Sequence, residues 1–181
     1  RDECRGVKTF RLSVPEDFSF IPGMWVMVDF PDDPRLARAY SISSSPFEKG
    51  HIEISMNKVG PLTQRLFALK GGETLALKGP YGKWVYRGEA RHAVLISGGT
   101  GLTPLRSMCR YALDNKLAGR ITLLYSSKTP SDMLYRGDLE RFAAAGIKVY
   151  ATITRPDAMT AGEAWSGPTG RLDIEVIRRE V

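Results

Sequence analysis

The strongest constraint on the fold is an apolar run that leads straight into glycines and then into an amphipathic helix. Residues 92–96 (HAVLI) are almost wholly apolar, which is typical of a strand buried on both faces. Apolar residues then recur at helical spacing over 105–113. Similar strand segments follow at 121–125 and 147–153, with a helix expected between them at 138–145. Alternating strands and helices predict a doubly wound parallel sheet.

The first half of the chain has a different periodicity. Phe10, Leu12 and Val14 alternate with polar residues, as they do in a half-buried strand. Several short strands separated by turns predict an antiparallel β-barrel. Its further strands are expected at 25–30, 40–43, 52–56 and 75–77, with one helix from Pro61 to about Leu69. We therefore expect a barrel domain over residues 1–89 and an α/β domain over residues 90–181.

Composition narrows the possible functions. The net charge is +6, but the basic residues are scattered, so nucleic-acid binding has little support. Only two cysteines occur, Cys4 and Cys109, which excludes a cysteine-ligated iron–sulfur cluster within these residues. No membrane span is predicted, because no apolar run reaches about 18 residues, and a reducing cytoplasmic location is expected. His51 and His92 have no partner at ligand spacing, so no metal site is predicted.

The barrel half contains two candidate ligand-binding segments. In residues 38–44 (RAYSISS), Arg38 and Tyr40 share one face of a strand, and the Ser41 hydroxyl can donate or accept a hydrogen bond. In residues 60–66 (GPLTQRL), Pro61 suits the first position of a helix. The amides of that first turn can bind an anion, and the Thr63 hydroxyl lies beside them. Taken singly, an ordinary strand and an ordinary helix start explain these segments at least as well.

A third segment, residues 97–104 (SGGTGLTP), lies between a predicted strand and a predicted helix. This is the context in which a dinucleotide-binding loop occurs, and glycines let the backbone approach a phosphate closely. Thr103 is predicted to cap the helix, with Pro104 at its first position. Pro104 stands where the usual fingerprint has its third glycine. A ligand site is favoured here over a plain connection.

Two further segments follow the second and third parallel strands. Residues 127–128 and 154–155 stand at the carboxyl ends of strands, where open α/β sheets bind their ligands. Each segment can contact the adenosine end of a dinucleotide, and each can equally be a loop that faces solvent.

Four segments occur in one order, RAYSISSSP, GPLTQRL, GPYGKW and SGGTGLTP. Together they resemble the ferredoxin–NADP reductase superfamily, in particular its bacterial and archaeal flavin reductases and oxygenase reductase components. The similarity extends through LLYSSKTPSDMLYRGDLE and covers nearly the whole chain. The resemblance implies an FAD-binding β-barrel followed by an NAD(P)-binding domain.

The segments described above and the resemblance together give the expected site residues. FAD is expected to contact Arg38, Tyr40, Ser41, Ile42, Ser43, Gly60, Pro61, Leu62 and Thr63. NADPH or NADH is expected to contact Gly99, Thr100, Gly101, Thr103, Pro104, Ser127, Lys128 and Arg155. In the family, the tyrosine that matches Tyr40 packs on the flavin, and the serine that matches Ser41 lies near its reactive nitrogen. These two residues are therefore the candidates nearest the chemistry.

The implied reaction is hydride transfer between NAD(P)H and bound FAD. Electrons then pass to an iron–sulfur protein such as ferredoxin, or to another one-electron acceptor. Two alternatives stay open, an electron-transfer flavin subunit of a larger redox complex and a nucleotide-binding module without catalysis. Family members normally have one more strand before residues 7–14 and continue past Val181. The chain is therefore expected to lack that first strand and to be incomplete at its C-terminus.

The segment after the second parallel strand indicates which nucleotide, NADPH or NADH, the protein prefers. An NAD site usually has an acidic residue there, whereas this chain has no carboxylate until Asp132. Ser127, Lys128 and Arg155 instead offer hydroxyl and cationic donors that suit a 2′-phosphate. The segment therefore favours NADPH, although relatives with similar segments use either nucleotide.

Overall fold

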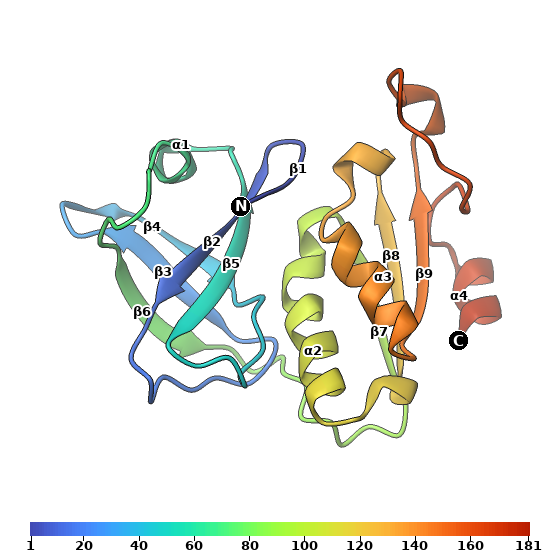
Figure 1. The fold of residues 1–181 in the computed structure, drawn as a ribbon, viewed down its shortest axis with the longest axis horizontal. Helices are drawn as coiled ribbons and strands as arrows, with labels where there is room; N and C mark the ends of the chain where they lie inside the picture. Colours follow the sequence, from blue (N-terminus) through green and yellow to red (C-terminus); the bar gives the residue numbers. More distant parts are fainter.

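The computed structural model describes residues 1–181 and contains two domains that lie side by side (Figure 1). The N-terminal half is built from antiparallel strands, and the C-terminal half is a parallel sheet with helices. The fold class predicted from periodicity is therefore confirmed. None of the helices is long and apolar enough to cross a membrane.

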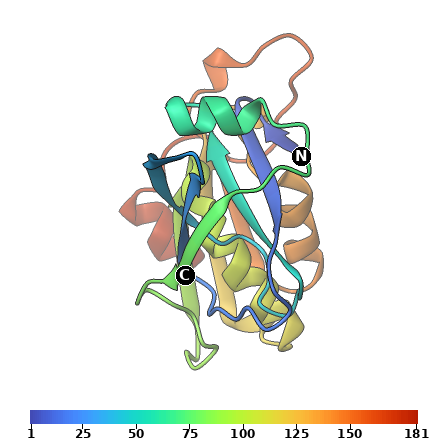
Figure 2. The same ribbon diagram turned by 90° about the vertical axis from the view of Figure 1, so that its left-hand side faces the viewer.

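The N-terminal domain consists of two three-stranded antiparallel sheets that face each other. Their strands are β1 (Asp2–Cys4), β2 (Val7–Ser13), β3 (Trp25–Phe30), β4 (Asp33–Ser41), β5 (His51–Asn57) and β6 (Ala76–Tyr81). The spatial orders are β1-β2-β5 and β4-β3-β6. Strand β1 precedes residues 7–14 and pairs with β2, so the expectation of no strand there was wrong. Val26, Ile42 and Ile54 are fully buried between the sheets. Helix α1 (Pro61–Phe67) lies across one end of the barrel (Figure 2). Its Leu62 and Leu66 belong to the same core.

The prediction for β4 was too short. This strand begins at Asp33, not near Tyr40, and pairs with β3 in the register Val28↔Arg38 and Val26↔Tyr40. Its first residues are largely polar and solvent-exposed, so they show no apolar alternation. Cross-strand hydrogen bonds, which no local pattern reveals, extend the strand to Asp33.

The C-terminal domain is a parallel sheet in the order β7-β8-β9. Its strands are β7 (Ala93–Gly98), β8 (Ile121–Ser127) and β9 (Lys148–Ile153). Helices α2 (Leu102–Asp114) and α3 (Arg136–Ala144) lie between the sheet and the barrel, and α4 (Ile174–Glu180) lies on the far side (Figure 1). Leu95, Leu105, Leu123 and Phe142 belong to the core that the helices and the sheet enclose.

The start of α2 differs from the prediction. Residues Gly99–Gly101 form a turn of 3₁₀ helix, and α2 follows at Leu102 without a side-chain cap. The Thr103 hydroxyl donates to the Thr100 carbonyl at 2.8 Å from inside the first turn. The prediction that Thr103 caps the helix with Pro104 at its first position was therefore wrong. The 3₁₀ turn already brings the chain into helical conformation, so the first amides of α2 are not covered by a capping side chain.

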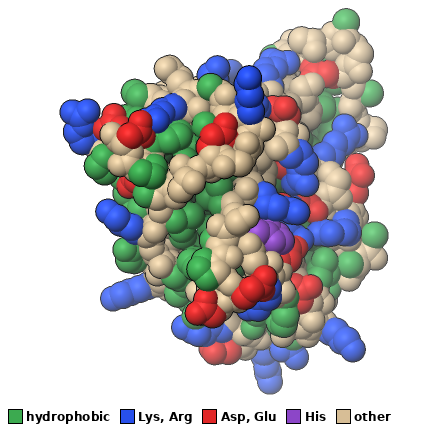
Figure 3. Space-filling model, turned by 60° about the vertical axis from the view of Figure 1, so that its left-hand side comes forward, with side chains coloured by type: hydrophobic (Ala, Val, Ile, Leu, Met, Phe, Trp, Pro, Cys, Tyr) green, Lys and Arg blue, Asp and Glu red, His purple; other side chains and the backbone are tan.

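The boundary between the two hydrophobic cores does not coincide with the boundary between the two domains. Val7 of β2 and Tyr86, in the connection between β6 and β7, are both buried in the core cluster of the C-terminal domain. On the outer surface, basic and acidic side chains are interspersed, with apolar atoms visible between them over the barrel (Figure 3). That face shows no continuous block of positive charge.

Candidate functional site

A groove of about 400 Å³ brings together the two candidate segments of the barrel. It is lined by Arg38, Ala39 and Tyr40 of β4 and by the loop and first turn of α1, residues 59–63. Arg38 is exposed and makes no ion pair, and its Nη1 donates only to the neighbouring Ala37 carbonyl at 2.8 Å. Its guanidinium is therefore free to bind an anion. We call this space the barrel groove.

Tyr40 offers both a ring and a hydroxyl to the barrel groove. It is partly buried, and this burial raises the pKa of its phenol, while the positive charge of Arg38 acts in the opposite direction. The phenol is consequently protonated at neutral pH and can donate a hydrogen bond. Its flat ring suits stacking on an aromatic ligand.

The loop before α1 is shaped by its own hydrogen bonds. Pro61 is the first residue of the helix, as predicted. The Thr63 Oγ1 atom accepts from the amides of Val59 and Gly60, at 2.8 and 2.9 Å, and donates to the Gly60 carbonyl. The Thr63 hydroxyl therefore holds the loop in place, and Leu62 points into the barrel core. The Arg65 side chain is engaged elsewhere, with Asp32.

Two of the expected FAD contacts lie outside this groove. The side chain of Ile42 is fully buried between the sheets. The Ser43 hydroxyl is also buried and donates to the Glu53 carbonyl at 3.1 Å. Their backbone amides donate to the carbonyls of Met24 and Glu53. The structure thus brings Arg38, Tyr40 and Gly60 together but does not add Ile42 and Ser43 to them.

A second groove, of about 250 Å³, crosses from the barrel to the glycine turn. We call it the junction groove. Tyr40 and Ser41 line it on one side, and Thr100 and Thr103 line it on the other. It is completed by Ala39, by Ser55, Met56 and Asn57 of β5, and by Val59 and Thr63. The strand motif of the barrel and the glycine turn of the sheet thus meet in one cavity.

A third groove, of about 470 Å³, follows the carboxyl edge of the parallel sheet. We call it the sheet-edge groove. It is lined by residues 98–100, 126–128, Asp132, Leu134 and Thr154, and from the barrel domain by Cys4, Arg5, Val7 and Asn57. Gly99 has φ +52°, and a Cβ atom placed on it meets no atom within 4 Å. The backbone at Gly99 is therefore open to a ligand.

The predicted residues at the strand ends have different environments. Lys128 is exposed and lines the sheet-edge groove. The Ser127 hydroxyl is buried and donates to the Thr129 carbonyl at 2.9 Å, so it is not free for a phosphate. Arg155 is exposed and lies beside Lys128 through a backbone hydrogen bond of 2.8 Å, but it does not line the groove. Gly101 and Pro104 do not line these grooves either.

Sequence reasoning missed several residues that line the grooves. Arg5 and Asn57 come from the barrel domain and reach the sheet edge only because the two domains pack together. Asp132 ends a short 3₁₀ turn, Pro130–Asp132, that folds back after β8 and brings this residue to the groove wall, where its Oδ2 atom accepts from the Thr129 hydroxyl at 2.9 Å. The Thr-Pro-Ser-Asp sequence is a turn signal that could have indicated this return.

Cys4 provides a pH-dependent probe of the sheet-edge groove. Burial, together with Asp132 and Glu3, raises the pKa of its thiol to about 11. We expect a thiolate fraction of about 10⁻³ at pH 8, and alkylation that accelerates about tenfold per pH unit up to pH 10. Iodoacetamide labelling of a Cys109→Ala variant, followed by mass spectrometry, measures this rate. Fast labelling with a plateau near pH 8 would contradict the assignment.

Comparisons with known proteins identify both domains. Residues 1–86 match the family model of the oxidoreductase FAD-binding domain, and residues 95–181 match that of the oxidoreductase NAD-binding domain. Sulfhydrogenase 1 subunit gamma of Pyrococcus furiosus is 33% identical over 90% of this chain and 56% of its own length. Ferredoxin–NADP reductase B of Sorangium cellulosum is 31% identical over 88% of this chain and 66% of its own.

The chain thus spans little more than half the length of the first of these relatives. Among solved structures, the cytochrome P450 reductase GcoB of Amycolatopsis superimposes with a TM-score of 0.83 at 23% identity, over 100% of this chain and 55% of that protein. The resemblance seen in the four motifs is confirmed. The chain belongs to the ferredoxin–NADP reductase superfamily, with an FAD-binding barrel followed by an NAD-binding α/β domain.

Proposed function

We propose that this chain is the core of an FAD-dependent NAD(P)H oxidoreductase. The observation that carries the proposal is the junction groove, in which Tyr40 and Ser41 share one cavity with Thr100 and Thr103. When bound, FAD and the nicotinamide nucleotide supply the hydride-transfer chemistry, which requires the two rings to meet. The task of the protein is to orient them at the boundary between its domains.

The residues of the barrel groove fit FAD. The free guanidinium of Arg38 can form a charge-assisted, two-pronged contact with a pyrophosphate. Tyr40 presents an aromatic face and a protonated hydroxyl, and Ser41 adds a hydroxyl at the junction groove. Gly60 leaves the loop before α1 open, because a Cβ atom there meets nothing within 4 Å.

The sheet-edge groove fits a nicotinamide dinucleotide. Gly98, Gly99 and Thr100 expose backbone at the start of α2, where the helix dipole favours the phosphates. Lys128 and Arg5 add positive charge. The junction groove is lined by hydroxyl, amide and apolar side chains, with neither a carboxylate nor a histidine. Its residues therefore orient ligands, and no general base is assigned.

The electron acceptor is proposed to be a one-electron carrier, such as an iron–sulfur protein of the ferredoxin type. A second candidate is an electron-transfer subunit within a larger redox complex. It is favoured by the 33% identity to a protein named as the gamma subunit of a sulfhydrogenase. Both cysteines have free thiols, which is compatible with the cytoplasm as the proposed location.

The test is anaerobic titration of the purified, FAD-loaded protein with NADH and with NADPH. We expect the yellow flavin absorbance to bleach in proportion to the nucleotide added. A protein that binds FAD but keeps its absorbance with both nucleotides would instead be a binding module without catalysis. Oxidised ferredoxin and cytochrome c can then be compared as acceptors by the rate at which the colour returns.

The nucleotide preference is predicted to depend on Asp132. The sequence-based preference for NADPH assumed that no carboxylate lies at the end of β8, but Asp132 lines the same groove as Lys128. A carboxylate there accepts hydrogen bonds from a ribose 2′-hydroxyl and repels a 2′-phosphate. We expect Asp132→Asn to shift the NADPH to NADH ratio of kcat/KM about tenfold toward NADPH, equivalent to roughly 1.4 kcal/mol.

Two further variants complete this measurement. Lys128→Ala should lower the efficiency with NADPH a few-fold, because its side chain is exposed. Asp157→Asn removes an exposed carboxylate that does not line the groove and should leave the ratio unchanged. If Asp132→Asn behaves like Asp157→Asn, then Asp132 does not contact the ribose.

A further inference from the structure

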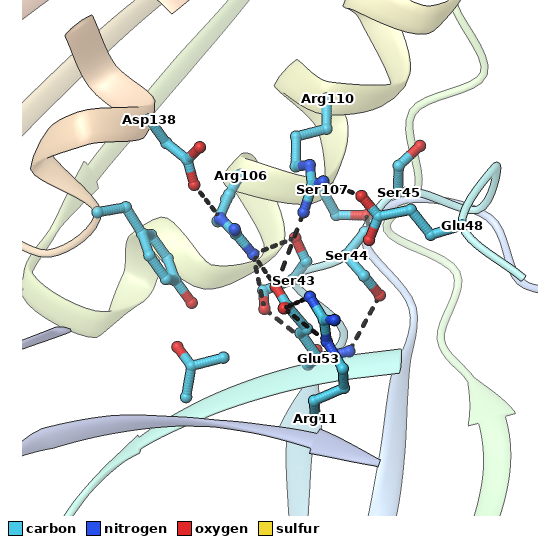
Figure 4. A network of polar contacts seen from close by, with 12 residues as sticks. Arg11, Ser43, Ser44, Ser45, Glu48, Glu53, Arg106, Ser107, Arg110 and Asp138 are labelled. Carbon is cyan, nitrogen blue, oxygen red and sulfur yellow. Dashed lines mark hydrogen bonds and ion pairs between the residues drawn. The ribbon is translucent and has the colours of Figure 1, made fainter. Parts of the chain in front are cut away.

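A cluster of charged residues, buried at its centre, joins the two domains (Figure 4). At its centre lies Arg106 of α2, whose side chain is only 4% exposed. Its Nη1 atom donates to Glu53 Oε2 of the barrel at 2.7 Å, and its Nε atom donates to Asp138 Oδ2 of α3 at 2.5 Å. One guanidinium therefore bridges a carboxylate from each domain.

Each carboxylate of the cluster is paired with at least one arginine. Arg11 Nη2 donates to the other Glu53 oxygen at 2.9 Å, and Arg110 pairs with Glu48. Three arginines thus face three carboxylates, those of Glu48, Glu53 and Asp138 (Figure 4). Burial raises the pKa of Glu53, but hydrogen bonds from Arg106 and Arg11 outweigh it and leave this pKa below its ordinary value. Glu53 is therefore charged when it binds Arg106.

The same helix also binds the segment that follows the flavin motif. Arg106 Nη1 donates to the Ser43 carbonyl at 3.2 Å, and Ser107 Oγ donates to the Ser44 carbonyl at 2.7 Å. The Ser45 hydroxyl donates to Asp114, near the end of α2. Three successive serines, separated from β4 only by Ile42, are thus bound to side chains along the length of α2.

Tyr135 forms a second bridge beside Arg106. It has φ +55° although it is not glycine, a left-handed conformation that bulky residues rarely adopt. Its ring lies 4.5 Å from the Arg106 guanidinium, and its hydroxyl bonds to Ser55, which lines the junction groove. Ser55 in turn bonds to Thr9 at 2.6 Å. Backbone strain of this kind persists where surrounding contacts hold it.

These contacts link the two cofactor-binding segments through rigid elements. Arg106 lies on the first two turns of α2, directly after the Gly99–Gly101 turn. Its partner Ser43 lies two residues after Ser41, and Glu53 lies two residues before Ser55. Interfaces between domains are usually mobile, whereas buried, directional bonds of this kind can select one orientation.

We propose that Arg106 is a positioning residue for hydride transfer, which sets the distance between the glycine turn and the flavin-binding strand. The proposal rests on the proposed function, and it assigns Arg106 no contact with either cofactor. It predicts that loss of the guanidinium impairs the alignment of the two cofactors more than the binding of either one. A misplacement of about 1 Å can reduce a reaction rate by roughly 100-fold.

The main variant is Arg106→Met, which keeps an unbranched stem but removes the donors. Flavin reduction at saturating nucleotide should slow by about 10- to 100-fold, with the FAD content and the nucleotide Kd changed less than about threefold. The matched control is Arg141→Met, because Arg141 pairs with the same Asp138 at 3.0 Å but has a 53% exposed side chain on its own domain. The control should reduce flavin at the parent rate.

A second readout does not depend on turnover. Hydrogen–deuterium exchange in the flavin-loaded full chain should accelerate at least tenfold at residues 43–55 and 102–110 in Arg106→Met but not in Arg141→Met. A parent protein that fails to bleach with NAD(P)H would refute the proposed function, and the exchange data would still test the domain contact. If the parent protein bleaches, and Arg106→Met has the same rate of flavin reduction and the same hydrogen–deuterium exchange as the parent, only the role of Arg106 would be overturned.

Stability is separated from positioning by two further variants. Removing one partner of a buried pair leaves an unpaired charge, so Arg106→Met can also lower the melting temperature. The double variant Arg106→Met with Glu53→Gln should recover part of that stability while flavin reduction remains slow. Arg106→Lys, which keeps the charge but not the planar fork, should give an intermediate rate. A double variant that regains the parent rate would show that Arg106 acts on stability alone.

Discussion

Replacing Gly99 by valine is expected to block flavin reduction by the nicotinamide nucleotide and to leave FAD in place. Gly99 has φ +52°, lines the sheet-edge groove, and has no atom within 4 Å of the place a Cβ would take. A β-branched side chain would both strain this conformation and fill the space where backbone must approach the phosphates. We expect kcat/KM for the nucleotide to fall by roughly 100-fold or more. Stopped-flow reduction of the FAD-loaded variant measures the effect.

The matched control is Gly71→Val. Gly71 also has a positive φ, +110°, and a Cβ atom there also meets nothing within 4 Å, but it lies in a turn away from the glycine loop. Because φ +110° lies outside the left-handed α region, valine there carries a backbone penalty at least as large as at Gly99, without obstructing the sheet-edge groove. Equal losses of nucleotide affinity in the two variants would show that strain, and not the blocked groove, explains the effect.

Arg38→Ala is expected to weaken FAD binding by about 10- to 150-fold in Kd. A charge-assisted hydrogen bond to an ionised partner contributes roughly 1.5–3 kcal/mol, and Arg38 makes no ion pair in the protein that would compete for its guanidinium. We expect the Arg38→Ala protein to purify with little bound yellow flavin, and to regain the flavin colour only at high FAD concentration. Titration of the apoprotein with FAD, followed by flavin fluorescence, gives the affinity.

Arg35→Ala provides the comparison for Arg38. Arg35 lies on the same strand, pairs with Asp33 at 3.0 Å and does not line the barrel groove. Its loss removes the same charge from β4 without removing the proposed pyrophosphate contact. An Arg38→Ala protein with the FAD affinity of Arg35→Ala would exclude Arg38 as the pyrophosphate ligand.

The sequence predicted the elements whose hydrogen bonds or periodicity are local. Strand β7, the glycine turn after it and the first helical position of Pro61 are all visible in short windows. The expected burial of this strand on both faces was wrong, because β7 lies at the edge of the sheet, where Leu95 is buried but Ile96 is 47% exposed. The alternation of Arg38 and Tyr40 also placed both residues on the barrel groove. In these cases the side-chain pattern alone determines which way a residue points.

Contacts between distant segments could not be predicted in this way. Arg106 and Glu53 are separated by 53 positions, and neither belongs to a motif or a charge pattern. Asp132 reaches the sheet-edge groove only because a 3₁₀ turn folds back, and Ser127 is withdrawn from it by one hydrogen bond to Thr129. Such details depend on how whole elements pack, and this packing has no signature in a single sequence.

The burial of Val7 and Tyr86 in the C-terminal core affects whether either half can exist by itself. If the chain were cut at the boundary between the barrel and the α/β domain, the core of the α/β half would lack Val7. The barrel expressed alone would expose the Val7 side chain to water. We therefore expect the halves to be poorly modular: separately expressed pieces should tend to aggregate, and co-expression should rescue them. The two nucleotide-binding halves would then fold and be inherited together. In a chimaera with a relative, replacing both halves should succeed more readily than replacing one half alone.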